Sequence, residues 1–487
     1  MATKSPPDGL DDRRVRRRLE SVSGSRGSNV AVMLSALHKD PKASSRLIWA
    51  LSIPVLAQNL LGMFVGWSDT ILTGRLLGEV HLLAAVTVSG YLLWLIETSG
   101  TFVSKGTEAI VARLVGAEEF DDAAAMTLQS LLLGFLVGLG VMLVVWGSAE
   151  TVIGWILPDE LARGPAVEYL VIAGSSCPMM LLLRVGVGAL RAAGYTIAGM
   201  WIITIVNVVN IAASWILATG LGPIPAFGWA GVAAGTATAY VVGGLVTLAW
   251  LVRGEGRLRV PLRIPKPDLA VFRRILNIGV PGGVNGMSVV VCQLWYLSII
   301  SGLGNAAIAA HGVAIRGESV SWLMADAMSV AAATLVGQSL GARRPDLARQ
   351  YGWAVFGYGA VLLSLFGVGF VLGAPLIFAL FTPPEMTDSV RALGVPVLQL
   401  IALGMPALAA TIILTRALQG AGDTRWPLLY DAAGFLLVRI PLAYLFTSAA
   451  VGLGLLGAWL AMLIDLYFRG TCATLRYHFG DWAKTRV

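Results

Sequence analysis

Long stretches without charge constrain this chain more than any other feature of its sequence. Three of them contain no Asp, Glu, Lys or Arg: Leu128–Trp146, Trp229–Val252 and Tyr351–Leu372. A helix needs about 20 mostly apolar residues to cross the roughly 30 Å hydrocarbon core of a bilayer. Charged residues make up only 13% of the chain, against about 25% in ordinary soluble domains. The sequence therefore predicts an all-α integral membrane protein.

Breaks at Gly, Pro and charged clusters divide the apolar sequence into about twelve transmembrane helices. We expect them to begin near Leu47, Leu82, Ala123, Ala166, Ile197, Phe227, Ala270, Ala306, Leu347, Arg391, Trp426 and Val451. The longest polar interval divides them into six and six. The expected domains are a disordered basic arm (1–45), an N-lobe (46–252), a cytoplasmic linker (253–269), a C-lobe (270–475) and a cytoplasmic tail (476–487).

The distribution of Lys and Arg predicts the orientation in the membrane. Of 35 such residues, ten precede residue 47 and eighteen more fall at alternate ends of the expected helices, whereas the opposite side holds only Arg75, Arg163 and Arg391. Lys and Arg are enriched in cytoplasmic loops, so we expect both termini in the cytoplasm and the protein in the inner (plasma) membrane. The net charge of +7 is explained by this topology, so we expect no nucleic-acid partner. The basic arm is expected to be a solvated, disordered tail, and its contact with anionic membrane lipids is the alternative.

The two halves of the chain resemble each other. LVGAEEFDDAA (114–124) aligns with SLGARRPDLAR (339–349), and ALRAAGYT (189–196) with ALQGAGDT (417–424), while Pro54 aligns with Pro281. The offsets are 225, 228 and 227 residues. Because each half has an even number of helices, the two repeats have the same membrane orientation. The expected fold is two six-helix bundles related by a pseudo-twofold axis along the membrane normal, with a substrate path between them.

One carboxylate stands within an otherwise uncharged run, Asp69 in LLGMFVGWSDTILTG (60–74). A charge at the centre of a membrane helix costs about 2.5–3.5 kcal/mol on insertion scales. At the repeat offset Asp69 aligns with Tyr296, so the scaffold does not require an acid there. Asp69 lies 23 residues after Arg46, in the outer part of the bilayer, and a helix-end residue that reaches the outer surface remains the alternative to a functional acid.

Asn207 and Asn210 lie one turn apart on the expected fifth helix and can share a face. Thr236 follows on the next helix. Carboxylate, amide carbonyl and hydroxyl oxygens are hard donors, suited to Na⁺ or to a protonated, hydrogen-bonded Asp. Amides at this depth can equally hold two helices together, so both interpretations stay open.

Further charges lie in or near the expected helices. We expect Lys105 and Glu108 (i, i+3) to neutralise each other, with Glu97 two turns upstream on a similar face. Arg184, Glu318 and Asp326 are similar cases, and Asp431 with Arg439 and Asp465 with Arg469 are expected pairs. Structural pairing is the favoured role of these residues. For Glu97, Lys105, Glu108, Glu318 and Asp326 a role in gating is the alternative.

The sequence lacks the common motifs for metal binding, for redox-active cysteine pairs and for nucleotide binding. The four His residues form no HExxH motif, the three Cys residues no CxxC motif, and no GxxxxGK[ST] loop is present. We therefore expect no resident metal, no cofactor, no direct use of ATP and no enzymatic activity.

The segments PVLAQNLLGMFVGWSDTILTGRLLG, AAATLVGQSLGARRPDLA and RALQGAGDTRWPLL, together with VRIPLAYLF and FRGTCATLRYHFGDW, resemble those of multidrug and toxic compound extrusion (MATE) transporters. The resemblance covers about Ser45 to Trp482. It implies multidrug efflux by a secondary antiporter, with export of small organic, often cationic or amphipathic, compounds in exchange for H⁺ or Na⁺.

Residue by residue, the resemblance implies a cation-coupling site formed by Asp69, Asn210 and Thr236. Ser214 stands where many relatives have a second acid, and Val289 aligns with the seventh-helix Glu of another branch. The alternative from the same superfamily is a flippase of a lipid-linked precursor, which a large cationic central cavity would favour. We expect a monomer with small organic substrates.

The orientation can be tested by labelling single cysteines in cells. Positions Arg259 and Val487 should react with an impermeant reagent only from the cytoplasm, and Gly222 only from outside, because 28 Lys and Arg residues lie on one side and three on the other. Labelling of Gly222 from the cytoplasm would reverse the assigned orientation.

Overall fold

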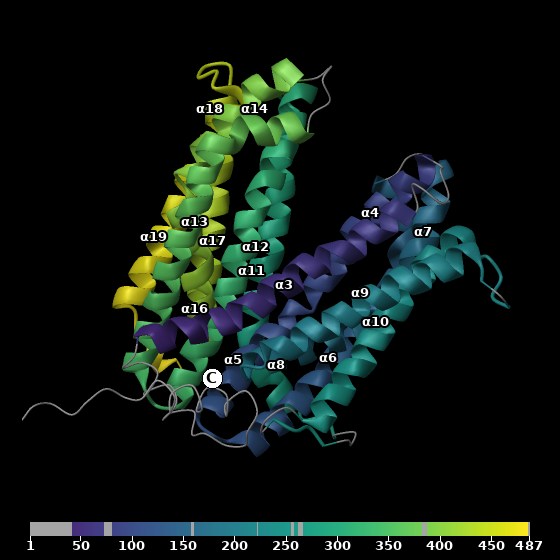
Figure 1. Cartoon of the computed structure of the whole chain (residues 1–487), viewed down its shortest axis with the longest axis vertical. Helices are drawn as coiled ribbons and strands as arrows, with labels where there is room; N and C mark the ends of the chain where they lie inside the picture. The colour runs from purple at the N-terminus through teal and green to yellow at the C-terminus, as the bar shows by residue number, and fades with distance from the viewer. Residues whose placement is uncertain are drawn as a thin grey trace, which may run out of the picture.

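The computed structural model describes residues 41–72, 80–156, 160–221, 223–254, 258–261, 266–381 and 387–485. Inside the helices it leaves out some side chains, among them those of residues 63–70. The described residues are almost entirely helical. They form two bundles, drawn in purple to teal and in green to yellow, that meet at one end and diverge toward the other (Figure 1).

The N-lobe contains eight described helices. They are α3 (Pro41–Leu72), α4 (Val80–Ser99), α5 (Thr101–Gly116), α6 (Phe120–Ile156), α7 (Glu160–Gly174), α8 (Cys177–Ala192), α9 (Thr196–Thr219) and α10 (Gly228–Arg253).

The C-lobe repeats this order, with two π-helical turns, η3 and η4. Its elements are α11 (Leu269–Ser301), α12 (Asn305–Gly341), α13 (Pro345–Phe381), α14 (Thr387–Ala402), α15 (Met405–Ala409), η3 (Ala410–Leu414), α16 (Thr415–Gly420), α17 (Arg425–Ala433), η4 (Gly434–Arg439), α18 (Ile440–Thr447) and α19 (Gly454–Phe479), followed by the 3₁₀ turn η5 (Trp482–Lys484).

These elements make up the twelve predicted membrane-crossing segments. By length and apolarity, eight unbroken spans of the described chain could cross a membrane, and two bent helix pairs bring the number to ten. Helix α3 and the α4–α5 pair complete the set. The bent pairs occupy equivalent places: α7 and α8 meet at 53°, and the segment from α14 to α16 bends by 60°. Each bend precedes a repeated proline, Pro178 or Pro406, in the first turn of the next helix, where a missing N–H costs little.

The second segment differs between the lobes. Helix α12 runs unbroken from Asn305 to Gly341, whereas its N-lobe counterpart is divided at Gly100 into α4 and α5. The repeat is therefore close but not complete.

The first helix of each lobe crosses to the hydrophobic core of the other lobe. Ile48 and Leu51 of α3 are buried in the C-lobe core. Ile275 and Ile278 of α11, exactly equivalent at the 227-residue offset, are buried in the N-lobe core. In Figure 1, α3 accordingly starts beneath the C-lobe and ends beside α4 of the N-lobe. This exchange interlocks the lobes at the end where they meet, hereafter the closed end.

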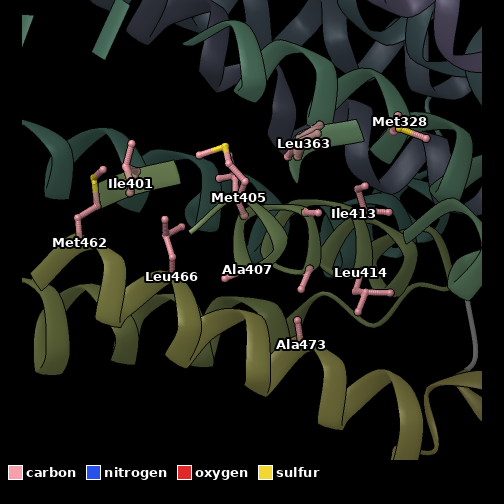
Figure 2. Packing of buried hydrophobic residues seen from close by; sticks show 14 of the residues in the cluster. Met328, Leu363, Ile401, Met405, Ala407, Ile413, Leu414, Met462, Leu466 and Ala473 are labelled. Carbon is pink, nitrogen blue, oxygen red and sulfur yellow. The ribbon is translucent and has the colours of Figure 1, made fainter. Parts of the chain in front are cut away.

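The C-lobe core is filled by Leu, Ile, Met and Ala side chains at the bend between α14 and α15. Figure 2 shows Met405 and Ile401 lying between the neighbouring helices, with Met462 and Leu466 of α19 facing them and Ala473 further along α19, near Leu414. Met405 and Ile401 are fully buried. Unbranched Met side chains adapt to the irregular space that such a bend leaves.

Repeated glycines allow the lobes to touch through their backbones at the closed end. A Cβ on Gly116 would lie 2.0 Å from the backbone oxygen of Gln338, and a Cβ on Gly341 would lie 2.0 Å from that of Arg113. Gly116 is equivalent to Gly341, and Arg113 to Gln338, at the 225-residue offset. The contact is thus reciprocal, like that of an isologous dimer.

Hydrogen bonds repeat the same reciprocity. Arg113 Nη2 donates to the Ala421 oxygen at 3.0 Å, and Gln338 Nε2 donates to the Ala192 oxygen at 2.9 Å. The acceptors lie at the C-terminal ends of α16 and α8, where helix carbonyls lack partners within their own helix. The repeated segments 114–124 and 339–349, and 189–196 and 417–424, therefore lie at or beside one contact between the lobes.

Replacing Gly116 or Gly341 by Ala should open the closed end, because the added methyl group overlaps a backbone oxygen that cannot move alone. Spin labels at the exposed equivalent residues Asp121 and Asp346 should then report a longer distance between the lobes. The control is Gly357→Ala on α13, where a Cβ meets no atom within 4 Å. An unchanged distance in both variants would show that the close contact does not hold the lobes together.

Candidate functional site

A polar cluster joins α9 and α10 within the N-lobe. Asn210 Nδ2 donates to Thr236 Oγ1 at 3.0 Å. Ser214 Oγ donates to the Val232 oxygen at 3.2 Å. Asn210, Ser214 and Thr236 are all buried. The helices approach closely because Gly235 lies against Ser214, where a Cβ would be 2.3 Å from the Ser214 nitrogen.

Asp69 belongs to α3, but its side chain lies outside the described part of the structure. Its level can be given from the backbone. Helix α3 packs along α9, with Gln58 against Gly199, and both helices start at the closed end. Eleven residues further along, about 16 Å at 1.5 Å per residue, α3 reaches Asp69 and α9 reaches Asn210. The two positions are therefore at about the same height.

Glu97 is held within the N-lobe rather than near Lys105. Its carboxylate forms an ion pair with Arg184 of α8 and accepts a hydrogen bond from the Tyr240 hydroxyl of α10. The expectation that Glu97 and Lys105 share a helix face is wrong, because the chain breaks at Gly100 between them. Tyr240 carries no charge, so charge patterning gave no signal for it.

Two further acids, Asp326 and Glu318, belong to α12. Asp326 Oδ2 accepts a hydrogen bond from Asn59 Nδ2 of α3 at 3.0 Å, which joins the lobes. Glu318 is buried at 7% exposure and forms neither an ion pair nor a hydrogen bond with the described residues. Their roles in gating stay predictions.

The expected Lys105–Glu108 pair is wrong. Glu108 instead faces Arg416 of the C-lobe, with Oε2 3.6 Å from Nη1. Within the described part of the chain Lys105 has no ionic partner. Residues three apart on a helix can meet, but here their side chains diverge: Glu108 lies against Gly188 of α8 and Lys105 against Gly282 of α11.

The C-lobe contains a buried network of two Asp and two Arg residues. The Asp465 carboxylate accepts a hydrogen bond from Arg439 Nε at 2.9 Å. It also accepts hydrogen bonds from Arg469 Nε and Nη2, each at 2.9 Å. Asp431 accepts a hydrogen bond from Asn285 Nδ2 at 2.9 Å and lies 3.4 Å from Arg469 Nη1. The predicted Asp465–Arg469 pair is confirmed, and the Asp431–Arg439 pair is wrong.

The π-helical turn η4 separates Asp431 from Arg439 and explains this difference, since it changes the rotation between them. Gly434 begins the turn, and a Cβ there would lie 2.5 Å from Asp465 Oδ1. The network is neutral as a whole, so it suits a structural role.

The described residues contain no group of three or more His, Cys, Asp and Glu side chains arranged to hold a metal ion.

The fold is that of a membrane transporter with two repeated lobes. The family model MatE matches residues 54–216 and 281–445, one match in each lobe. The chain therefore belongs to the MatE family of transporters. This confirms the resemblance seen in the sequence and the two-bundle fold.

Curated relatives and a solved structure agree with this assignment. The "Uncharacterized transporter YisQ" of Bacillus subtilis is 26% identical over 463 residues, covering 93% of this chain and 98% of that protein. The "Probable multidrug resistance protein NorM" of Thermotoga maritima is 28% identical over 455 residues, covering 92% and 95%. A MOP superfamily transporter from Pyrococcus furiosus superimposes with a TM-score of 0.83 at 22% identity, covering 95% of this chain and 100% of the other.

Replacing Asp465 by Asn should destabilise the C-lobe by about 3–5 kcal/mol, because it removes the carboxylate that two buried Arg side chains share. Thermal unfolding in detergent measures the loss. The control is Asp346→Asn, whose partner Arg344 is exposed to solvent, and little change is expected there. Equal effects of both substitutions would contradict a stabilising role for the buried network.

Proposed function

We propose that this protein is a secondary active antiporter that exports small organic compounds, cationic or amphipathic, in exchange for H⁺ or Na⁺. The observation that carries the proposal is a polar cluster present in one lobe of a symmetric scaffold. Asn210, Ser214 and Thr236 gather in the N-lobe at the height of Asp69. The position equivalent to Asp69 holds Tyr296, so this cluster has no acidic counterpart in the C-lobe.

The proposed cycle alternates the two lobes between a state closed at one end and a state closed at the other. Asp69 supplies a carboxylate that binds the coupling ion, and Asn210 and Thr236 supply neighbouring oxygen and amide groups. Carboxylate and hydroxyl oxygens suit Na⁺, and the same groups can hydrogen-bond a protonated acid. The ion drives the cycle only if it binds the two states with different affinity.

The alternative is a flippase of a lipid-linked precursor, for which a large cationic cavity would be expected. The cavity of about 20 Å³ that the described residues line at the closed end is too small for either kind of substrate, since pockets for small organic molecules measure about 300–1,000 Å³, and it does not distinguish the two functions. The naming of the Thermotoga relative for multidrug resistance supports the exporter. The description of the Pyrococcus neighbour, which gives it a binding pocket of reverse polarity, supports the alternative.

The distribution of Lys and Arg supports a place in the inner (plasma) membrane with both termini in the cytoplasm. In that orientation the closed end faces the cytoplasm. The proposal includes a monomer with lipid as its surroundings, no nucleic-acid partner and no enzymatic activity.

Asp69→Asn keeps the shape of the side chain but removes its charge and its titration. We expect normal insertion into the membrane and loss of ion-driven export, with a smaller loss in Asn210→Ala. The measurement is efflux from proteoliposomes at matched protein levels, with H⁺ and Na⁺ gradients imposed separately.

The matched control is Tyr296→Phe at the equivalent C-lobe position, where the buried hydroxyl has no hydrogen-bond partner among the described residues. It should export like the wild type. If Asp69→Asn still exports in response to an imposed gradient, Asp69 is not the coupling residue, and Glu97 and Asp326 are the next acids to test.

A further inference from the structure

A small cavity lies between the lobes at the closed end, and the side chains that line it carry more positive than negative charge. Its volume is about 20 Å³, and residues of α5, α8, α12 and α16 line it. Its ionisable side chains are Lys105, Glu108, Arg191 and Arg416. The lining thus has three cations and one carboxylate, drawn from both lobes.

The single carboxylate does not balance these cations. Glu108 lies 3.6 Å from Arg416. Lys105 and Arg191 form no side-chain hydrogen bond or ion pair with the described residues, and the buried Nε of Arg191 is without a partner. The next carboxylate, Asp326, interacts electrostatically with Arg191 but is bound by Asn59. Counting Asp326, one positive charge remains. These side chains are half-buried, and uncompensated charge in such a partly desolvated place is still unfavourable.

The repeat shows that the scaffold does not require these charges. At the 225-residue offset Lys105 is equivalent to Val330 and Glu108 to Ala333, which also line the cavity. At the 228-residue offset Arg191 is equivalent to Gln419, another lining residue. The cavity therefore lies at the pseudo-twofold axis, and each of these charges occurs in only one half.

The space fits a single small particle. A cavity needs about 10–15 Å³ of this kind of volume to hold one water molecule, and a water molecule would leave the excess charge uncompensated. Gln419 offers the cavity an adaptable polar group, because its Oε1 is buried without a partner among the described residues and so nothing fixes the amide in this orientation. Turned about its last bond, this amide donates an N–H instead.

We infer that this cavity binds one small monovalent anion, of which chloride is the representative, between Lys105, Arg191 and Arg416. Lys105 and Arg191 belong to the N-lobe and Arg416 to the C-lobe, so the anion bridges the lobes. It binds when the closed end is intact and leaves when the lobes separate there. Halide thus stabilises the closed end by binding one state in preference to the other, whatever compound the protein exports.

Bromide locates the site directly, because its anomalous X-ray scattering distinguishes it from water. Crystals of the wild-type protein in sodium bromide should show an anomalous peak between the Lys105 ammonium and the guanidinium groups of Arg191 and Arg416. Crystals in sodium gluconate should show none. Crystals with the closed end intact but no bromide peak in the cavity would overturn the inference.

Thermal unfolding in solution gives a second readout that involves no transport. At constant sodium concentration, replacing gluconate by chloride should raise the Tm of the wild type by about 2 °C, the order of effect expected for a ligand near saturation. Lys105→Val and Arg191→Gln, which introduce the residues of the other half, should lose this response. Arg344→Gln, at an exposed ion pair of the same end, should keep it. An equal response to chloride in all four proteins would contradict the assigned site.

Discussion

The close backbone contact between the lobes at the closed end determines how the rest of the structure is arranged. Gly116 and Gly341 bring helices α5 and α12 together so closely that a methyl group on either would overlap a backbone oxygen of the other lobe. The crossing of α3 and α11 into the opposite cores adds burial of apolar surface at the same end. Both features are reciprocal, so the two lobes contribute equivalent surfaces to the contact, which suits the proposed alternation between two states.

The residues of the proposed ion and anion sites lie where the two halves differ. Asp69 aligns with Tyr296, and Lys105, Glu108 and Arg191 align with Val330, Ala333 and Gln419. In the proposed function, the polar cluster in one lobe and the excess charge at the axis would give the two halves different tasks. The C-lobe network is instead neutral and buried, and it anchors three helices.

The fold could be predicted from the sequence because it depends on local properties: the length of the apolar segments, the Gly, Pro and charged residues that end them, and the internal repeat. The expected starts near Ala270, Ala306 and Trp426 lie within one residue of the observed helix starts at Leu269, Asn305 and Arg425. Pairing of charges was less predictable, because it depends on rotation about helices and on contacts between distant segments. The π-helical turn η4 redirected Arg439 to Asp465. Arg416 pairs with Glu108 across the lobes. The repeat alignment could have singled out Arg416, because the equivalent residue in the other half is Gly188.

Helix α3 connects the proposed ion site with the closed end. Its first turns, at Ile48 and Leu51, belong to the C-lobe core, while its last turns carry Asp69 at the height of Asn210 in the N-lobe. Asn210 itself is 14 residues from the start of α9, about 21 Å from the closed end. Over this distance a bound ion makes no contact with the residues that join the lobes, so a coupling between the two places has to pass through the helices. In the proposed cycle, a rigid shift of α3 would move both ends together, whereas a bend at Pro54, inside the helix, would let the end that carries Asp69 move while the C-lobe holds the other. The helix that supplies the titratable group is thus also the one that the C-lobe holds.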